Sequence, residues 1–271
     1  MDKLIITIAS TGNVPTKDIT PYAALTKEEI VDDIEKCSKL GASLAHIHVR
    51  DKNLEPTSDR NTFKEVLDEI DRREIKVIKQ VSTGARGGEN TIKSRGQMLD
   101  LNIHMASLST GSSNFSSLVN ANSFELINAL AEKMYENNIK PEIEVFDTAM
   151  LFNALYLLKK GVLKSPLHFN LVMNVPGSIK GTPKNLMFLY DNLPGNSTWT
   201  VTAIGKSHVQ LATMAVALGG HVRTGLEDVI YFDKDKFATN EMLVKRIVNI
   251  STAVGREIAT YEEAKKILSL T

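Results

Sequence analysis

The sequence has no excess of charge of either sign. Its 32 lysines and arginines are balanced by 32 aspartates and glutamates, so the formal net charge at pH 7 is zero. Proteins that bind nucleic acids or anionic membranes usually carry a basic surface, and this composition gives no such signal. We therefore expect a small-molecule partner, with no nucleic acid and no membrane.

Long apolar runs are also missing. No stretch approaches the roughly 20 consecutive apolar residues that a membrane-spanning helix requires. The opening, MDKLIITIAS, is too short and too acidic for a secretory signal. With neither feature we expect a cytoplasmic protein. The 42% hydrophobic and 24% charged residues are typical of an ordinary soluble globular protein, and 271 residues can bury a sizeable core.

Signatures of nucleophilic and nucleotide chemistry are scarce. The one cysteine, Cys37, lies where Ile30, Ile34, Cys37 and Leu40 recur at helical spacing, so we expect a core-facing thiol without a catalytic or redox role. No GxGxxG follows the first β-rich run, and no Walker loop occurs, which weakens the dinucleotide and nucleotide interpretations.

What the sequence does contain is a regular alternation of short β-rich runs with longer amphipathic ones. The predicted strands cover residues 4–10, 42–49, 76–82, 104–108, 141–147, 167–173, 197–204 and 221–224. The predicted helices cover residues 27–40, 62–72, 91–99, 123–137, 149–160, 183–189, 209–218 and 235–254, and residues 264–270 form the closing segment. Eight β/α units without a dividing linker predict an α/β fold, a (β/α)8 TIM barrel formed as a single catalytic domain by residues 1–271. A doubly wound open sheet is the main alternative.

Two histidines stand out in the second predicted strand. His46 and His48 are two residues apart, so on a strand their side chains point to the same face. Such a pair can hold one metal ion through two nitrogens. The alternative is a pair of hydrogen-bonded histidines near a strand end. Arg50 and Asp51, directly after them, either support this site or form a surface pair.

An arginine and two acids surround the last predicted strand. Glu227 and Asp228 follow it, and Arg223 lies on it. A catalytic zinc usually has a third protein ligand, often a carboxylate, and adjacent carboxylates after a turn can diverge. Arg223 can hold a carboxylate or lower the pKa of a neighbouring acid. Without the histidines, the acidic pair would instead suit a helix N-terminus.

Small polar residues follow two other strands. The turn at Ser82, Thr83 and Gly84 offers hydroxyls and free backbone N–H groups to an anionic group such as a carboxylate, and Ser107 and Ser109 offer hydroxyls in the same way. Ordinary turn chemistry explains these residues equally well.

Other polar residues are less specific. Glu142 and Glu144 share one face of the fifth predicted strand, and a buried acid there needs a partner, so Glu144 is a candidate supporting group near the metal. A structural role is favoured for His208 and His221.

Several motifs, taken in order, carry a family resemblance. They are IASTGN (8–13), GASLAHIHVRD (41–51), VSTG (81–84), MASL (105–108), PEIEVFD (141–147), VPG (175–177) and GGHVRTGLED (219–228). Together they cover nearly the whole chain, which resembles the β-keto acid cleavage enzymes, whose founding activity is 3-keto-5-aminohexanoate cleavage in lysine fermentation.

The resemblance implies a zinc-dependent barrel that assembles as a homo-oligomer, usually a tetramer. By position, His46, His48 and Glu227 resemble the Zn²⁺ ligands, Asp228 with Arg223 resembles the base pair, and Ser82 with Ser107 resembles part of the substrate-carboxylate site. The implied acyltransferase reaction converts a β-keto acid and acetyl-CoA into acetoacetate and a new acyl-CoA. It proceeds by enolate attack and retro-Claisen cleavage, without a nucleophilic side chain.

The sequence departs from the family at two places. The turn after the first strand carries Val14 where the 3-keto-5-aminohexanoate enzymes have an acid that can pair with the substrate's ammonium group. We therefore expect the β-keto acid to be uncharged or apolar beyond its keto group. After the seventh strand, Lys206 stands where many relatives have arginine, so it keeps the charge without the bidentate fork.

Two other functions are compatible with the same residues. A zinc-dependent hydrolase or aldolase on the same barrel would also suit the histidine pair and a later carboxylate. The amidohydrolase pattern, however, places its pair on the first strand. A non-catalytic metabolite-binding barrel would have no need to keep Arg223, Glu227 and Asp228 together.

Overall fold

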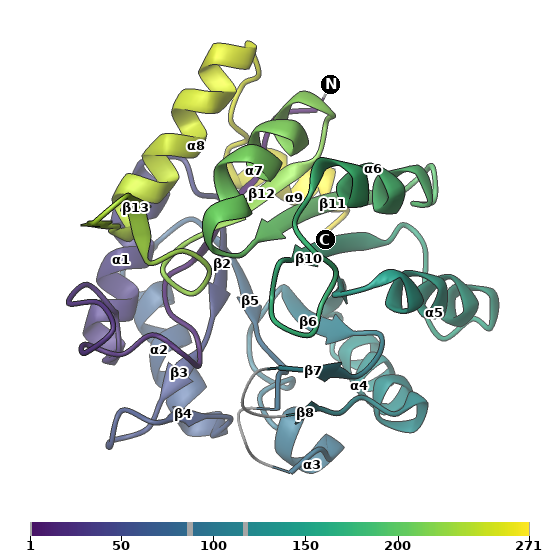
Figure 1. Ribbon diagram of the computed structural model, residues 1–271. Coiled ribbons are helices and arrows are strands. Elements are labelled where there is room, and N and C mark those ends of the chain that lie inside the picture. Colours follow the sequence, from purple (N-terminus) through teal and green to yellow (C-terminus); the bar gives the residue numbers. More distant parts are fainter. Residues whose placement is uncertain (1, 86–88, 116–118, 271) are drawn as a thin grey trace.

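Eight parallel strands form a closed barrel (Figure 1). A computed structural model describes residues 2–85, 89–115 and 119–270. The barrel strands are β1 (Ile6–Ala9), β2 (Leu44–Ile47), β5 (Ile78–Val81), β6 (Met105–Ser109), β9 (Lys140–Val145), β10 (His168–Met173), β11 (Thr198–Ala203) and β12 (His221–Thr224). Each coincides with a predicted strand. The predicted TIM barrel is confirmed, and the open sheet is wrong because β1 pairs with both β2 and β12.

Helices cover the outside of the barrel, as Figure 1 shows. They are α1 (Lys27–Lys39), α2 (Arg60–Arg72), α3 (Ile92–Arg95), α4 (Phe124–Glu136), α5 (Thr148–Lys159), α6 (Pro183–Asp191), α7 (His208–Ala217), α8 (Asn240–Val254) and α9 (Tyr261–Ile267). A Ser, Thr or Asp side chain caps nearly every N-terminus by accepting a backbone N–H, as Thr26 does for α1. The predicted burial of Cys37 on α1 is confirmed.

Two predicted helices differ from the observed ones, and one observed helix was not predicted. The helix at 91–99 is only one turn, α3, and continues as irregular turns. The helix predicted from residue 235 starts at Asn240, because Thr239 caps it and the hairpin of β13 (Tyr231–Asp233) and β14 (Lys236–Phe237) precedes it. The unpredicted helix is α9, which overlaps the closing segment and starts where Thr260 and Glu263 form a capping box.

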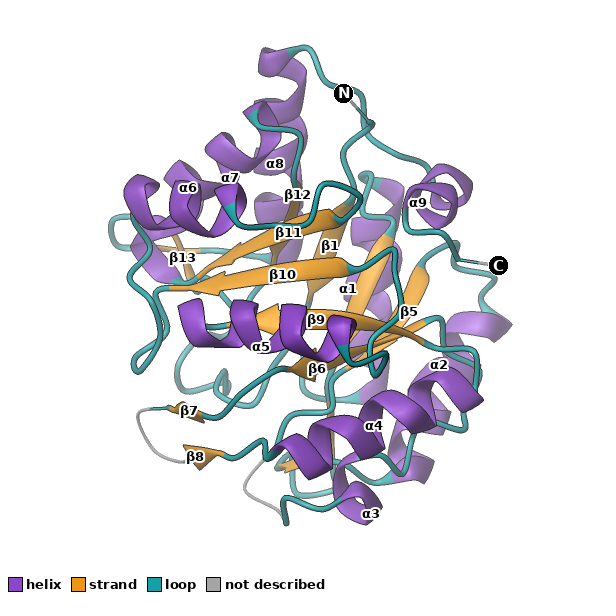
Figure 2. Ribbon diagram, turned by 90° about the vertical axis from the view of Figure 1, so that its right-hand side faces the viewer, coloured by secondary structure: helices purple, strands orange, loops and turns teal. Residues whose placement is uncertain are grey.

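The two ends of the barrel differ in chemistry. Figure 2 shows α9 at the end of the barrel where the strands begin. Ile5, Leu44 and Ile78 pack there with Ala264 and Leu268. At the opposite end, three hairpins follow barrel strands: β3 (Val49–Arg50) with β4 (Pro56–Thr57), β7 (Ser113–Asn114) with β8 (Val119–Asn120), and β13 with β14. In a TIM barrel the loops at this second end form the active site. No helix within the described residues is long and apolar enough to cross a membrane.

Candidate active site

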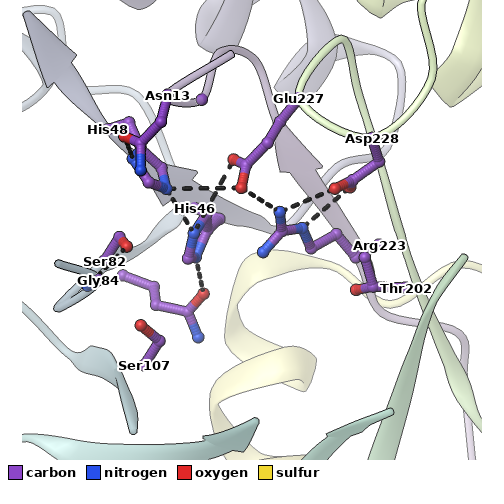
Figure 3. A network of polar contacts seen from close by, with 12 residues as sticks. Asn13, His46, His48, Ser82, Gly84, Ser107, Thr202, Arg223, Glu227 and Asp228 are labelled. Atoms are coloured by element: carbon purple, nitrogen blue, oxygen red, sulfur yellow. Dashed lines mark hydrogen bonds and ion pairs between the residues drawn. The ribbon is translucent and has the colours of Figure 1, made fainter. Parts of the chain in front are cut away.

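His46 and His48 face each other at the end of β2. Their Nε2 atoms are 3.3 Å apart, and both side chains are buried. His46 lies on β2 between Ala9 of β1 and Gln80 of β5, and His48 follows the strand directly. The expectation that strand alternation puts both imidazoles on one face is confirmed (Figure 3).

Glu227 completes a three-residue cluster. Its Oε1 is 3.5 Å from His48 Nε2, and its Oε2 is 3.9 Å from His46 Nε2. Ligand atoms about 2.0–2.2 Å from a tetrahedral zinc lie roughly 3.3–3.5 Å from one another. One ligand atom from each of the three residues lies within 4.8 Å of the other two, which is near the spacing that a metal ion requires, and Glu227 Oε2 is buried without a hydrogen bond. The residues fit a divalent metal.

Two amide side chains orient the histidines. Gln80 Oε1 is 2.6 Å from His46 Nδ1, and Asn13 Oδ1 is 3.1 Å from His48 Nδ1. An amide oxygen accepts a hydrogen bond, so each Nδ1 carries the proton and each Nε2 presents its lone pair to the cluster. Burial and the charge of Arg223 lower the pKa of His46 to about 3, which keeps it neutral. Sequence reasoning missed both amides, although Gln80 shares a strand face with Ser82.

The loop that carries Asn13 is held by Arg50. Its guanidinium donates to the backbone carbonyls of Gly12 at 2.6 Å and Pro15 at 2.8 Å. Asp51 instead accepts from the backbone N–H groups of Asn53 and Glu55. Arg50 therefore supports the site through the β1–α1 loop, and the alternative of an Arg50–Asp51 surface pair is wrong.

Arg223 joins the cluster to Asp228. Its Nη2 lies 2.5 Å from Glu227 Oε1 and donates to Asp228 Oδ1 at 2.9 Å, and its Nε donates to Asp228 Oδ2 at 3.0 Å. Burial raises the pKa of Asp228 to about 6 despite the opposing charge of Arg223. For Glu227, burial acts in the same direction, but Arg223 and the two histidines outweigh it and lower the pKa. Arg223 therefore lowers the pKa of both carboxylates, as expected, but for Asp228 burial outweighs its effect.

The polar groups of the turn at residues 82–84 make more hydrogen bonds within the protein than the sequence predicts. The N–H of Thr83 donates to Ser107 Oγ at 3.2 Å, and the N–H of Gly84 donates to Ser82 Oγ at 3.2 Å. Thr83 Oγ1 donates to the Ser107 carbonyl at 2.7 Å, between β5 and β6. The expectation of free N–H groups here is wrong, because the neighbouring hydroxyls accept them. Figure 3 places Ser82, Gly84 and Ser107 beside His46.

A cavity of about 370 Å³ opens beside the cluster. Ser82, Gly84, Arg223, Asp228 and the three cluster residues form its polar wall. Its other wall is mainly apolar and includes Val14, Phe115, Phe146, Val172, Val175, Pro176 and Ile204.

Glu144 also lines this cavity. It accepts a hydrogen bond from Ser109 at 3.0 Å. Burial and the charge of Glu142 raise the pKa of Glu144 to about 7. The hydrogen bond to Ser109 does not test whether Glu144 supports the metal site, so that role stays a prediction. His221 is structural, since its Nδ1 accepts the N–H of Ile5 at 3.1 Å.

Comparison with known proteins gives matches along the whole chain. Residues 3–270 match the family model described as beta-keto acid cleavage enzyme. A 3-keto-5-aminohexanoate cleavage enzyme from Acetoanaerobium sticklandii is 40% identical, with 100% of both chains covered. A 3-oxoadipate:acetyl-CoA acetyltransferase from Cupriavidus necator is 37% identical over 98% of this chain and 94% of that protein. Among solved structures, apo ObcA has a TM-score of 0.82 at 20% identity over 92% of this chain and 66% of its own, which is a likeness of fold.

Proposed function

The chain belongs to the β-keto acid cleavage enzyme family, and we propose that it converts a β-keto acid and acetyl-CoA into acetoacetate and a new acyl-CoA. One observation carries the proposal. Arg223 contacts both Asp228 and Glu227, one of the three candidate metal ligands. A candidate base therefore lies directly beside a candidate metal site. The whole chain would act as one catalytic domain.

The metal is proposed to be zinc, held by His46, His48 and Glu227. Two imidazoles and a carboxylate are a common zinc set, and when bound the ion would act as a Lewis acid toward the substrate's ketone oxygen. Gln80 and Asn13 keep the imidazole lone pairs directed at it. Ser82, with Thr83, Gly84 and Ser107 around it, is the proposed site for the substrate carboxylate.

Asp228 is the proposed base. Its raised pKa suits proton transfer near neutral pH, and two hydrogen bonds from Arg223 fix its carboxylate. Asp228 takes a proton from the carbon between ketone and carboxylate. That carbon bonds to the thioester carbonyl of acetyl-CoA, and CoA leaves as a thiolate. The thiolate adds to the original ketone carbon, and the bond between this carbon and the carbon that Asp228 deprotonated breaks. Asp228 then returns its proton to the departing acetoacetate.

The substrate tail is proposed to be apolar. Val14, Phe115, Phe146, Val172 and Ile204 surround the space beyond the polar wall, and burying apolar groups there is favourable. A second candidate is 3-keto-5-aminohexanoate itself, because Glu144 lies in the same cavity and a carboxylate suits an ammonium group. The raised pKa of Glu144 disfavours its charged form and supports the apolar choice.

A panel of β-keto acids that differ only in the tail tests this proposal. We expect acetoacetate and acyl-CoA only when acetyl-CoA is present, with alkyl tails turned over faster than the amino tail. Hydrolysis of a β-keto acid in the absence of acetyl-CoA, with no acetoacetate formed, would instead favour a hydrolase. Val14→Glu should shift the preference toward the amino tail, whereas Val254→Glu, an exposed valine at the end of α8, should not.

Assembly as a homotetramer is also proposed. Phe124, Phe152 and Tyr156 are exposed on α4 and α5, with the Phe124 and Tyr156 ring centroids 6.0 Å apart. An exposed cluster of large apolar side chains suits a subunit contact. Size-exclusion chromatography with light scattering should give a tetramer for the wild-type chain and a smaller species for Phe152→Glu.

A further inference from the structure

A second cavity adjoins the site. It has a volume of about 690 Å³ and lies between the β1–α1 loop, the start of α7 and the β13–β14 hairpin. Glu227 and Asp228 lie in the walls of both cavities. The two cavities therefore meet at the proposed base, which is where the acetyl thioester has to arrive.

His208 is a buried polar group in this second cavity. It is 1% exposed, and among the described residues its ring nitrogens have no side-chain hydrogen-bond partner, only the backbone of Arg223 close to one of them. Burial and the charge of Arg246 lower the pKa of His208 to about 4, against the effect of the Arg223 backbone. That carbonyl can occupy at most one ring nitrogen. A neutral imidazole has one donor and one acceptor, which matches a secondary amide.

Two cations lie farther along the same cavity. Lys206 is exposed in the turn directly before α7, whose N-terminus has no side-chain cap. Arg246 packs on Phe232, 3.5 Å from the ring centroid, and donates to the Phe232 carbonyl at 2.5 Å. In the hairpin, Lys234 is offset by Asp233 and Asp235. The cationic end of the cavity is therefore on the α7–α8 side, where phosphate groups would be stabilised.

We propose that acetyl-CoA occupies this second cavity, with its thioester at Asp228, its pantetheine amides at His208 and its phosphates at Lys206 and Arg246. This inference rests on the proposed function. The apolar side chains of Ile204 and Phe232 in the cavity wall suit the pantetheine chain between the two polar ends.

Steady-state kinetics with two thioesters tests the assignment. Acetyl-pantetheine has the amides of acetyl-CoA but lacks its diphosphate and 3′-phosphate. Lys206→Glu should raise the KM for acetyl-CoA at least tenfold and leave the KM for acetyl-pantetheine, the KM for the β-keto acid and the metal content unchanged. Lys76→Glu, an exposed lysine just before β5 at the opposite end of the barrel, is the charge-matched control and should change nothing.

The His208 contact has its own readout. His208→Leu should raise the KM for both thioesters, and His208→Gln, which keeps a donor and an acceptor, should restore most of the loss. Unchanged KM values for acetyl-CoA in Lys206→Glu and His208→Leu would overturn the inference, as would an equal Lys206→Glu effect on both thioesters. If the wild-type chain has no acetyl-CoA-dependent turnover of any β-keto acid, the proposed function fails instead.

Discussion

The guanidinium of Arg223 binds the carboxylate of Asp228 through two hydrogen bonds of 2.9 and 3.0 Å. The same group lies 2.5 Å from a Glu227 oxygen, so one arginine fixes a proposed metal ligand and the proposed base. The two carboxylates respond differently, because burial dominates for Asp228 and the neighbouring positive charges dominate for Glu227.

Replacement of Asp228 by asparagine should abolish proton transfer and leave the fold and the metal intact. Asparagine keeps the shape and can still accept from Arg223, but it cannot take a proton. We expect the kcat to fall by about 10²–10⁴-fold, the usual contribution of a positioned base. Circular dichroism and metal analysis provide the controls. A variant with near wild-type kcat would contradict the assignment of the base.

The pH dependence of kcat/KM should show an acidic limb near pH 6. The base works only when deprotonated, so activity should be full well above the pKa of Asp228, about 6, and fall by about tenfold per pH unit well below it. A bound metal cation would move the limb lower. Arg223→Gln removes a positive charge and should move it to higher pH. A limb at the same pH in both proteins would show that Asp228 is not the titrating group.

Removal of the amide behind His46 should weaken the metal site. In Gln80→Leu the hydrogen bond at 2.6 Å is lost, so the ring is no longer held with its lone pair toward the cluster. We expect metal affinity to fall by about 10–100-fold, measured by competition with a chelator. Gln97→Ala, on a turn outside the site, is the control. Equal metal affinity in both variants would mean that Gln80 has no part in the site.

Gly12 should be irreplaceable for a steric reason. A Cβ at this position would lie 2.4 Å from Cγ of Glu227, so Gly12→Ala has to displace the side chain that is the proposed third metal ligand. We expect metal affinity and activity to drop together, by at least about tenfold. Gly195→Ala, where a Cβ meets nothing within 4 Å, should behave like the wild-type chain. Normal metal binding by Gly12→Ala would place Glu227 outside the ligand set.

Local patterns predict most of the fold. The strands are short apolar runs, and helices such as α1 start at a capping Thr or Asp that is visible in the sequence. The misses have local causes too: the 91–99 segment keeps only one turn of helix, and a hairpin occupies the start of the segment predicted as helix from 235. Weak amphipathic patterns of this length do not distinguish a helix from a series of turns.

For the site, the sequence by itself determined that His46 and His48 share a face, because side chains alternate along any strand. It could not place Glu227 beside them, since those residues are far apart in the chain. Because β1 pairs with both β2 and β12, closure of the barrel places the ends of these two strands on either side of β1 and decides that contact. The same tertiary packing aligned Gln80 with His46, bound the N–H group of Thr83 to the Ser107 hydroxyl, and buried Asp228 enough to raise its pKa. Burial and cross-strand register depend on neighbours that only the folded chain supplies.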